Sequence, residues 1–407
     1  MNLKHKKKIF NDPVYGFIAT PYASILETID HPYFQRLRRI KQLGLTHMVY
    51  PGALHTRFHH AMGCTHLMRQ AIDTLRNNGH EISETEAEGV ILAILLHDIG
   101  HGPFSHALEH SIVKGMHHEE LSIIFMNELN KEMNGQLDVA IQIFSNKYPK
   151  KFLHQLVSSQ LDMDRLDYLK RDSFYTGVSE GVVSNQRIIK MLDIVNDELV
   201  IEQKGIYSIE KFIVARRLMY WQVYLHKTVI SAEFMLVKVL ERAKFLAKDN
   251  IELFCSPSLR LFLYNDITKE DFGKKAIIDA FAQLDDFDIL GAIKVWTGHE
   301  DKVLSLLSKM IIDRNLLKIK VQSEPFNDQI LTEKKESIAR KLGITLEETK
   351  YFVFTNWIEN NAYNPESDRI NILFKDGSVK DICDASDNLN IQALAKPVRK
   401  HFICYPK

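Results

Sequence analysis

The feature that most constrains the fold is an apolar run that ends in two polar residues, within the stretch ILAILLHDIGHGPFSH at positions 91–106. The run leaves no polar face, so a helix formed from it should be buried on every side. It ends in His97 and Asp98, and burying an imidazole and a carboxylate costs free energy unless another group pairs with them. A bound cation is the simplest partner, so the stretch predicts a metal site at the end of a buried helix.

Neighbouring helix positions point about 100° apart, so His97 and Asp98 cannot complete a coordination sphere alone. The chain offers a histidine-bearing helix before the pair, with His60, and an acidic helix after it, with Asp164. Two imidazoles and two carboxylates make a four-ligand centre that suits iron, manganese, zinc or nickel better than magnesium alone. Taken singly, His60 could equally be a packed core histidine and Asp164 a solvated acid, and only the conjunction of the three stretches favours the metal site.

Composition bounds what can surround such a site. The chain has 407 residues, 45% hydrophobic and 26% charged, which is enough for one large helical domain and a smaller second one. It shows neither a long apolar run nor an apolar signal segment, so we expect a cytoplasmic protein without a membrane span. Its four cysteines form no C-x-x-C pair, which argues against a disulfide framework and a structural zinc site. Lys plus Arg and Asp plus Glu both total 52, so a local basic cluster must hold any anionic ligand.

Sequence patterns place most of the first half on helices. Residues 8–21 are turn-rich and predict an extended arm or hairpin, and a helical pattern begins near Ser24. The stretch HPYFQRLRRIKQLG continues it, and a charge run of this kind usually forms a solvated face. A helix is predicted from about Thr56 to Asn77, and a capping box at residues 83–86 begins the central helix.

The second half changes character along its length. Helices are predicted from His117, over the acidic stretch SSQLDMDRLDYLKRDSFYTG, and as one long helix over residues 211–246. Short β-rich runs follow, which predict an α+β lobe. We therefore expect a mainly α fold with a helical core over residues 1–315 and a smaller C-terminal α+β lobe over residues 316–407.

Several stretches together resemble one known family. They are KIFNDPVYG, HPYFQRLRRIKQLG, YPGALHTRFHHAMG, LLHDIGHGPFSH, LDMDRLDYLKRD and YLHK. In these stretches the chain is similar to the HD superfamily of metal-dependent phosphohydrolases, and most of all to deoxynucleoside triphosphate triphosphohydrolases that join a sterile-alpha-motif domain to an HD domain. The match is to the HD part. The resemblance implies the metal ligands His60, His97, Asp98 and Asp164, the same set that the residues themselves suggest.

The resemblance also implies a reaction, the hydrolysis of a dNTP at the α-phosphorus to deoxynucleoside and triphosphate. A divalent transition metal in the HD site, and Mg²⁺ on the substrate phosphates, would be its cofactors. His106, oriented by Glu109, is then the expected acid or nucleophile-positioning group, and His101 and His118 are the other residues that titrate near neutral pH. The alternative for these histidines is a structural one, in which they only cap the Gly-Pro loop.

The substrate contacts implied by the family fall into two groups. Arg57, Arg165, Arg216 and Lys227 would hold the triphosphate tail. The sugar side would be formed by Gln42, Leu43, Tyr168, Asp172 and Tyr224, with Tyr224 closing the space that a 2′-hydroxyl would fill.

A second layer of the resemblance concerns regulation. In the family a guanine nucleotide bound between subunits assembles an active tetramer, so we expect a homo-oligomer, a dimer or tetramer, with a guanine nucleotide or second dNTP as effector. At a second effector pocket, Tyr363 stands where the family has Lys. The matching effector residues are Lys8, Ile9, Asn11, Asp30, Gln35, Arg38, Arg314 and Lys318.

Two other functions fit parts of the sequence. Another HD phosphohydrolase, such as a nucleotide phosphatase or phosphodiesterase, needs the same metal but not the four tail cations together. A non-catalytic nucleotide sensor or single-stranded nucleic-acid binder needs the cations but not the catalytic acid. The zero net charge and the full ligand set argue against the second of these.

Overall fold

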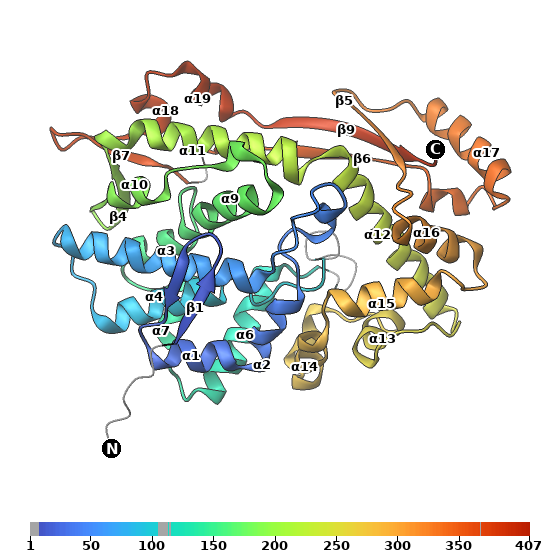
Figure 1. Cartoon of the computed structure of the whole chain (residues 1–407), viewed down its shortest axis with the longest axis horizontal. Helices are drawn as coiled ribbons and strands as arrows, with labels where there is room; N and C mark the ends of the chain where they lie inside the picture. Colours follow the sequence, from blue (N-terminus) through green and yellow to red (C-terminus); the bar gives the residue numbers. More distant parts are fainter. Residues whose placement is uncertain (1–7, 105–112, 114, 367) are drawn as a thin grey trace.

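The computed structural model describes residues 8–104, 113, 115–366 and 368–407. The fold is mainly α with small sheets, as predicted. In Figure 1 the helices α3, α4 and α9 lie on the same side of the molecule as the β1–β2 hairpin, α12 to α16 lie on the other side, and β6 and β9 run along the upper edge.

Most of the helices lie in the first three quarters of the chain. They are α1 (Ala23–Asp30), α2 (Pro32–Gln35), α3 (Arg57–Asn77), α4 (Glu84–Leu96), α6 (His118–Glu132), α7 (Asp138–Phe144), α8 (Lys151–Val157), α9 (Met163–Thr176), α10 (Asn185–Lys190), α11 (Ile206–Met219), α12 (Lys227–Lys248), α13 (Pro257–Tyr264), α14 (Lys275–Gln283), α15 (Asp286–Trp296) and α16 (Lys302–Ile312). The last quarter adds α17 (Asp328–Leu342), α18 (Ile382–Ala385) and α19 (Leu389–Leu394).

The strands of the described residues form three small sheets. An antiparallel hairpin joins β1 (Ile9–Asp12) to β2 (Gly16–Ala19), as the turn-rich N-terminal stretch predicts. A second sheet has the order β3 (Leu192–Val195), β4 (Glu198–Glu202), β7 (Asn371–Leu373) and β8 (Val379–Asp381). A third has the order β5 (Lys318–Gln322), β9 (Val398–Tyr405) and β6 (Phe354–Asn360).

The central helix α4 forms as its sequence predicts. The Ser83 hydroxyl accepts a hydrogen bond from the Glu86 amide at 3.2 Å, and the Glu86 carboxylate accepts one from the Ser83 amide at 2.8 Å, which completes the capping box. Every apolar residue from Val90 to Leu96 is buried, so the second half of this helix has no solvent face. The helix ends at Leu96, and the His97–Asp98 pair therefore begins where the regular helix stops.

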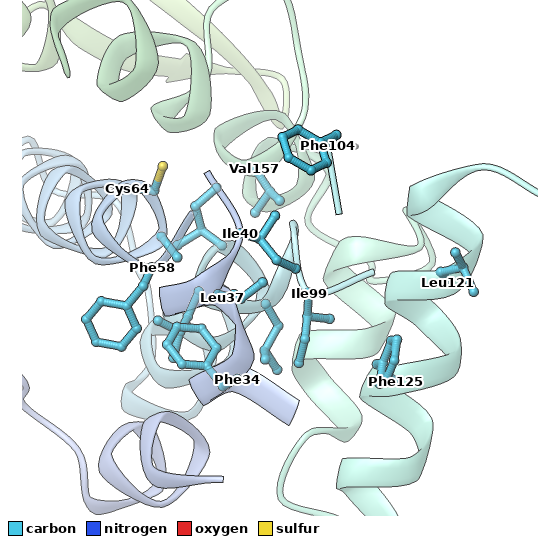
Figure 2. Packing of buried hydrophobic residues seen from close by; sticks show 14 of the residues in the cluster. Phe34, Leu37, Ile40, Phe58, Cys64, Ile99, Phe104, Leu121, Phe125 and Val157 are labelled. Carbon is cyan, nitrogen blue, oxygen red and sulfur yellow. The ribbon is translucent and has the colours of Figure 1, made fainter. Parts of the chain in front are cut away.

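The arginine-rich stretch does not form one solvated helix face. It breaks into the short helix α2 and a 3₁₀ turn at Arg36–Arg39, because its apolar residues turn inward. Figure 2 shows Phe34 and Leu37 packed among Phe58 of α3, Ile99 and Phe125 of α6 in one buried cluster. Of the arginines in this turn, Arg36 is fully buried while Arg38 and Arg39 are exposed.

The prediction of one long helix over residues 211–246 is wrong. Helix α11 ends at Met219, a π-helical turn covers Tyr220–Tyr224, and α12 begins at Lys227. The His226 side chain accepts a hydrogen bond from the Thr228 amide at 3.2 Å and so caps the new helix. The break changes the direction of the chain between Tyr224 and Lys227, which the helical periodicity of the sequence could not indicate.

The C-terminal segment is joined to the helical core at several points. Strand β7 pairs in parallel with β4, so one sheet contains strands from both sides of the predicted boundary at residues 315 and 316. The Ser231 hydroxyl of α12 donates to the Leu317 carbonyl at 2.8 Å. The division into two domains at this boundary stays a prediction.

Among the described residues, no helix is long and apolar enough to cross a bilayer.

The β4–β7 pairing gives a test of the fold. Ile372 is fully buried at the centre of β7, so Ile372→Ala should lower the free energy of unfolding by about 2–5 kcal/mol. Val379→Ala on β8, where the side chain is 40% exposed, is the control and should change it by less than about 0.5 kcal/mol. Urea denaturation followed by circular dichroism measures both, and equal effects of the two substitutions would contradict the buried position of β7.

Candidate metal centre

The four predicted ligands come together at the meeting point of α3, the end of α4 and the start of α9. Asp164 Oδ1 lies 3.0 Å from His60 Nε2 and 3.7 Å from His97 Nε2. Asp98 Oδ1 lies 3.3 Å from His97 Nε2, and Asp98 Oδ2 lies 3.8 Å from His60 Nε2. Residues that are far apart in the sequence therefore direct two nitrogens and two carboxylates toward one small volume.

Each of the two imidazoles is oriented by a hydrogen bond through its Nδ1 atom. His60 Nδ1 donates to Asp167 Oδ2 at 2.7 Å, and His97 Nδ1 donates to the Ile94 carbonyl at 2.7 Å. A ring that donates through Nδ1 presents the lone pair of Nε2, which is the arrangement of metal-bound histidines. The two rings meet edge to face with centroids 5.2 Å apart.

The residues present fit a divalent metal. His97 Nε2 is buried and has no hydrogen-bond partner among the described residues, although it is surrounded by carboxylates. A buried polar atom without a partner is costly, and a cation would satisfy it together with His60 and Asp164. The mixed nitrogen and oxygen donor set suits a transition metal better than magnesium.

The sulfur of Cys64, which the sequence did not indicate, lies 3.5 and 3.6 Å from the two ring nitrogens of His60. It is one helical turn after His60 on α3, and the thiol is fully buried. Burial raises the pKa of Cys64 well above its usual range. Its sulfur lies within 4.8 Å of ligand atoms of His60, His97 and Asp164, so it could also contact a metal held there.

Asp98 also binds groups outside the ligand set. The Arg57 guanidinium donates through Nη1 to Asp98 Oδ2, and His101 Nε2 lies 3.2 Å from Asp98 Oδ1. Although burial raises the pKa of Asp98, His97, the Arg57 guanidinium and a hydrogen bond from His101 hold it well below its usual range. The carboxylate therefore stays ionised where a cation would need it.

Of the predicted catalytic residues, the structure places His101 and His118. Their rings stack with centroids 3.9 Å apart, close to Asp98. Burial and the nearby Arg57 lower the pKa of His101 well below its usual range, so its ring is neutral at neutral pH. His106 and Glu109 lie outside the described residues.

The predicted tail cations differ in their surroundings. Arg57 is buried beside the metal ligands, and its Nε and Nη2 have no hydrogen-bond partner among the described residues. Arg165 donates to the Ser159 carbonyl at 2.5 Å, and Arg216 donates to the Ala362 carbonyl at 2.9 Å. Arg216 Nε is likewise buried without a partner, whereas Lys227 is exposed at the first position of α12.

The predicted sugar-side residues form a connected group around Asp172. The Tyr224 hydroxyl donates to Asp172 Oδ2 at 2.8 Å, and its ring meets that of Tyr168 edge to face at 6.0 Å. His55, which was not predicted, contacts Asp172 Oδ1 at 2.7 Å through Nε2. Gln42 and Leu43 are half-buried just before the 3₁₀ turn Gly44–Met48, and Gln42 Oε1 has no partner among the described residues.

Several predicted effector residues lie near one another beside the hairpin. Lys8 pairs with Asp30 at 3.1 Å, and Arg38 donates to the Gln35 side chain at 2.9 Å. Rings connect the two pairs, because Lys8 lies over Phe10, Arg38 lies over Phe58, and those two rings are 6.2 Å apart.

The remaining effector residues are divided between two places. Ile9 and Asn11 are exposed on β1. Arg314 donates to the Met48 carbonyl at 2.7 Å. Lys318 begins β5, a strand that Figure 1 labels on the opposite side of the view from β1.

Sequence reasoning missed Asp167 and Arg171 on α9. Arg171 binds both oxygens of Asp167, from Nε at 2.8 Å and from Nη2 at 3.0 Å. Although burial raises the pKa of Asp167, Arg171 and His60 hold it below its usual range. The spacing of four residues was a signal that the two side chains share a helix face, but it did not show that this face is buried against His60.

The chain is similar to proteins of known family. The HD domain model matches residues 57–172, and the model of the HD associated region matches residues 183–254. The crystal structure of a phosphohydrolase from Bacteroides thetaiotaomicron is 56% identical, with a TM-score of 0.96 over 99% of this chain and 100% of that one.

Curated sequences give the same result. An uncharacterised Bacillus subtilis protein, YwfO, is 33% identical over 99% of this chain and 93% of its own length. A deoxynucleoside triphosphate triphosphohydrolase SAMHD1 homolog of Dictyostelium discoideum is 34% identical over 61% of this chain and 52% of its own length.

The helical fold and the His-His-Asp-Asp cluster are those of the HD-domain metal-dependent phosphohydrolases. This chain belongs to that family, as the sequence predicted, and is related to the SAMHD1 proteins.

Removal of one ligand tests the metal centre. Asp98→Asn should abolish metal retention while the helices stay folded, because a site with one ligand fewer loses most of its affinity and α3, α4 and α9 keep their own packing. Elemental analysis gives the metal content per chain, and circular dichroism gives the melting temperature. The control is Glu84→Gln, an exposed carboxylate on α4. An Asp98→Asn protein that keeps a full equivalent of metal would contradict the assignment.

Proposed function

We propose that the protein is a metal-dependent deoxynucleoside triphosphate triphosphohydrolase, converting dNTP and water to deoxynucleoside and triphosphate. The observation that carries the proposal is the position of Arg57, which binds the metal ligand Asp98 through one nitrogen and leaves two buried nitrogens without a partner. A phosphate oxyanion beside the metal would satisfy both nitrogens in the bidentate manner that guanidinium favours.

In this proposal His60, His97, Asp98 and Asp164 hold the metal, which can be iron, manganese, zinc or nickel, while Mg²⁺ accompanies the substrate phosphates. When bound, the metal supplies a Lewis acid for the α-phosphate and lowers the pKa of the attacking water. The stacked pair His101 and His118 lies next to Asp98, and we assign it to the side of the site that contacts the reacting phosphate. His106, with Glu109, is the proposed proton donor to the leaving 5′ oxygen.

Binding of the rest of the nucleotide follows from the surrounding side chains. Arg57, Arg165, Arg216 and Lys227 neutralise the triphosphate tail. Arg216 is held by the Ala362 carbonyl and by Gln160 Oε1 at 3.1 Å, so its unpartnered Nε has a fixed direction. On the sugar side Tyr224 is fixed by its hydrogen bond to Asp172, which keeps its ring in place beside Tyr168. Gln42 and Leu43 complete the proposed sugar pocket.

The products test the reaction. The metal-loaded protein incubated with each dNTP should release inorganic tripolyphosphate and deoxynucleoside, because only attack at the α-phosphorus leaves the three phosphates joined. Mass spectrometry and ion chromatography identify the products. Release of orthophosphate or pyrophosphate instead would assign the chain to another HD phosphohydrolase activity, and no turnover of any nucleotide by metal-loaded protein would favour a nucleotide sensor.

Sugar selectivity gives a second test. A fixed Tyr224 ring leaves an added 2′-hydroxyl crowded and without a partner, so dATP should be hydrolysed on the order of 100-fold faster than ATP in kcat/KM. Tyr224→Ala should reduce this ratio strongly. Tyr224→Phe, which loses the hydrogen bond to Asp172 but keeps the ring and its edge-to-face contact with Tyr168, should retain more of it. Equal kcat/KM values for dATP and ATP in the unaltered protein would rule out the deoxy specificity.

We also propose that a guanine nucleotide or second dNTP activates the enzyme between subunits of a homo-oligomer, in the cytoplasm. The support is that Lys8, Asp30, Gln35 and Arg38 lie beside the hairpin, whereas Arg314 and Lys318 lie elsewhere in the same chain. In this proposal the two groups belong to one pocket that two copies of the chain form together, and a nucleotide that contacts two chains stabilises their association by mass action.

Arg38→Ala tests the activation. The variant should lose the increase in dNTP turnover that an added guanine nucleotide produces, and should keep its metal, because Arg38 does not touch the metal ligands. The control is Arg399→Ala, which removes another exposed arginine that lies over an aromatic ring, Trp357. Sedimentation velocity and initial rates are measured with and without GTP. Full turnover of a single dNTP, unaffected by GTP and by Arg38→Ala, would exclude this regulation.

A further inference from the structure

A buried chain of ion pairs joins the β1–β2 hairpin to the metal centre. Asp12, the last residue of β1, accepts a hydrogen bond from Arg171 Nη1 at 2.7 Å through Oδ2. Arg171 binds both oxygens of Asp167, and Asp167 Oδ2 accepts the Nδ1 hydrogen of His60 at 2.7 Å. Three hydrogen-bonded steps therefore connect a strand at the N-terminal edge to a ligand of the metal.

The side chains that form this series of ion pairs are buried. The Asp167 and Arg171 residues are fully buried, and Asp12 is buried where it meets them. A Cβ at Gly63, on α3, would overlap Asp167 Oδ1 and Arg171 Nη2. Because one guanidinium binds Asp12 through Nη1 and Asp167 through Nε and Nη2, Arg171 cannot turn away from Asp12 without disturbing its contact with Asp167. Removal of one partner from such a buried pair leaves an uncompensated charge, which is strongly destabilising.

The other oxygen of Asp12 shapes the hairpin itself. Asp12 Oδ1 accepts hydrogen bonds from the amides of Val14 and Tyr15, both at 2.9 Å, in the turn between β1 and β2. One carboxylate thus fixes the turn of the hairpin with one oxygen and binds Arg171 with the other. The hairpin position and the position of Arg171 are therefore mechanically linked.

We propose that the Asp12–Arg171–Asp167 chain positions His60 for the metal and couples the hairpin to the metal centre, so that hairpin order and metal affinity depend on each other. The coupling is reciprocal by thermodynamic linkage: whatever tightens the hairpin raises metal affinity, and the bound metal tightens the hairpin by the same factor. This rests on His60 serving as a metal ligand, as proposed above. Ile9 and Asn11 are exposed on the same strand as Asp12. A ligand bound to β1 would therefore change the metal affinity through the Asp12–Arg171–Asp167 ion pairs.

The decisive variant is Asp12→Asn. The amide oxygen of Asn can still accept the Val14 and Tyr15 hydrogen bonds, so the turn is kept, but its amide nitrogen would face the donor Arg171 and break the link. Asp301→Asn is the matched control. Like Asp12, Asp301 accepts a hydrogen bond from a nearby backbone amide, that of Leu304 at 2.8 Å, and so caps α16. It also pairs with an arginine, Arg242, but it lies away from the metal ligands.

The first measurement is the dissociation constant for Mn²⁺, obtained from free Mn²⁺ by electron paramagnetic resonance. Asp167→Asn, which alters the direct partner of His60, should weaken binding by roughly 10- to 100-fold. Asp12→Asn, one pair further away, should weaken it by roughly threefold to tenfold. Asp301→Asn should leave it within about twofold of the unaltered protein, although it also loses a part-buried ion pair. Arg171→Lys, which keeps the charge but cannot bind both carboxylates, is the second variant should Asp12→Asn fail to fold.

The second measurement is hydrogen exchange of the backbone amides in residues 9–19, with and without Mn²⁺. The metal should slow exchange there in the unaltered protein and in Asp301→Asn, but not in Asp12→Asn. A metal affinity of Asp12→Asn equal to that of Asp301→Asn would overturn the proposal, as would unchanged hairpin exchange on metal binding in the unaltered protein. Neither measurement uses a nucleotide, so the result is independent of whether tripolyphosphate is the product.

Discussion

Two imidazoles buried in the helical core, those of His60 and His97, each donate a hydrogen bond through Nδ1 to a protein oxygen and direct Nε2 toward Asp164. Neither ring can turn without losing its acceptor, and a buried imidazole that loses its acceptor is costly. The geometry of the centre therefore depends on the acceptors as much as on the ligands. One acceptor is the carbonyl of Ile94 in α4, and the other is the carboxylate of Asp167 in α9.

Buried guanidinium groups around this centre also bind protein oxygens. Arg36 donates to the Ile99 carbonyl at 2.7 Å, directly after the His97–Asp98 pair, and lies over the rings of Phe125 and Phe281. Arg57 binds Asp98, and Arg171 binds Asp167. Each buried cation thus contacts the segment that carries a candidate metal ligand or the hydrogen-bond acceptor of one. Together they offset the negative charge that several buried carboxylates bring into the core.

The C-terminal segment contacts the helical core outside the sheets as well as within them. The Ala362 carbonyl fixes Arg216, and the next residue, Tyr363, is almost fully buried. Its hydroxyl donates to Asp381 and accepts a hydrogen bond from the Ile370 amide at 3.0 Å. Tyr363 therefore joins the segments on either side of β7 and does not point to solvent.

The sequence by itself determined the parts that depend on local order. The capping box at Ser83 and the unbroken apolar run before His97 specify α4 and its end, and spacing and resemblance named His60, Asp98 and Asp164, which the structure brings together. Only the tertiary structure decided which polar residues bind and orient those residues and their neighbours in the site. Asp12, Arg171 and Asp167 come from two distant segments, His55 reaches Asp172 across more than one hundred residues, and the break at Leu225 depends on how α11 and α12 pack. Local periodicity reports which face of a helix is apolar, but it carries no information on which other element will cover a given polar side chain, because that is settled by packing between segments far apart in the chain.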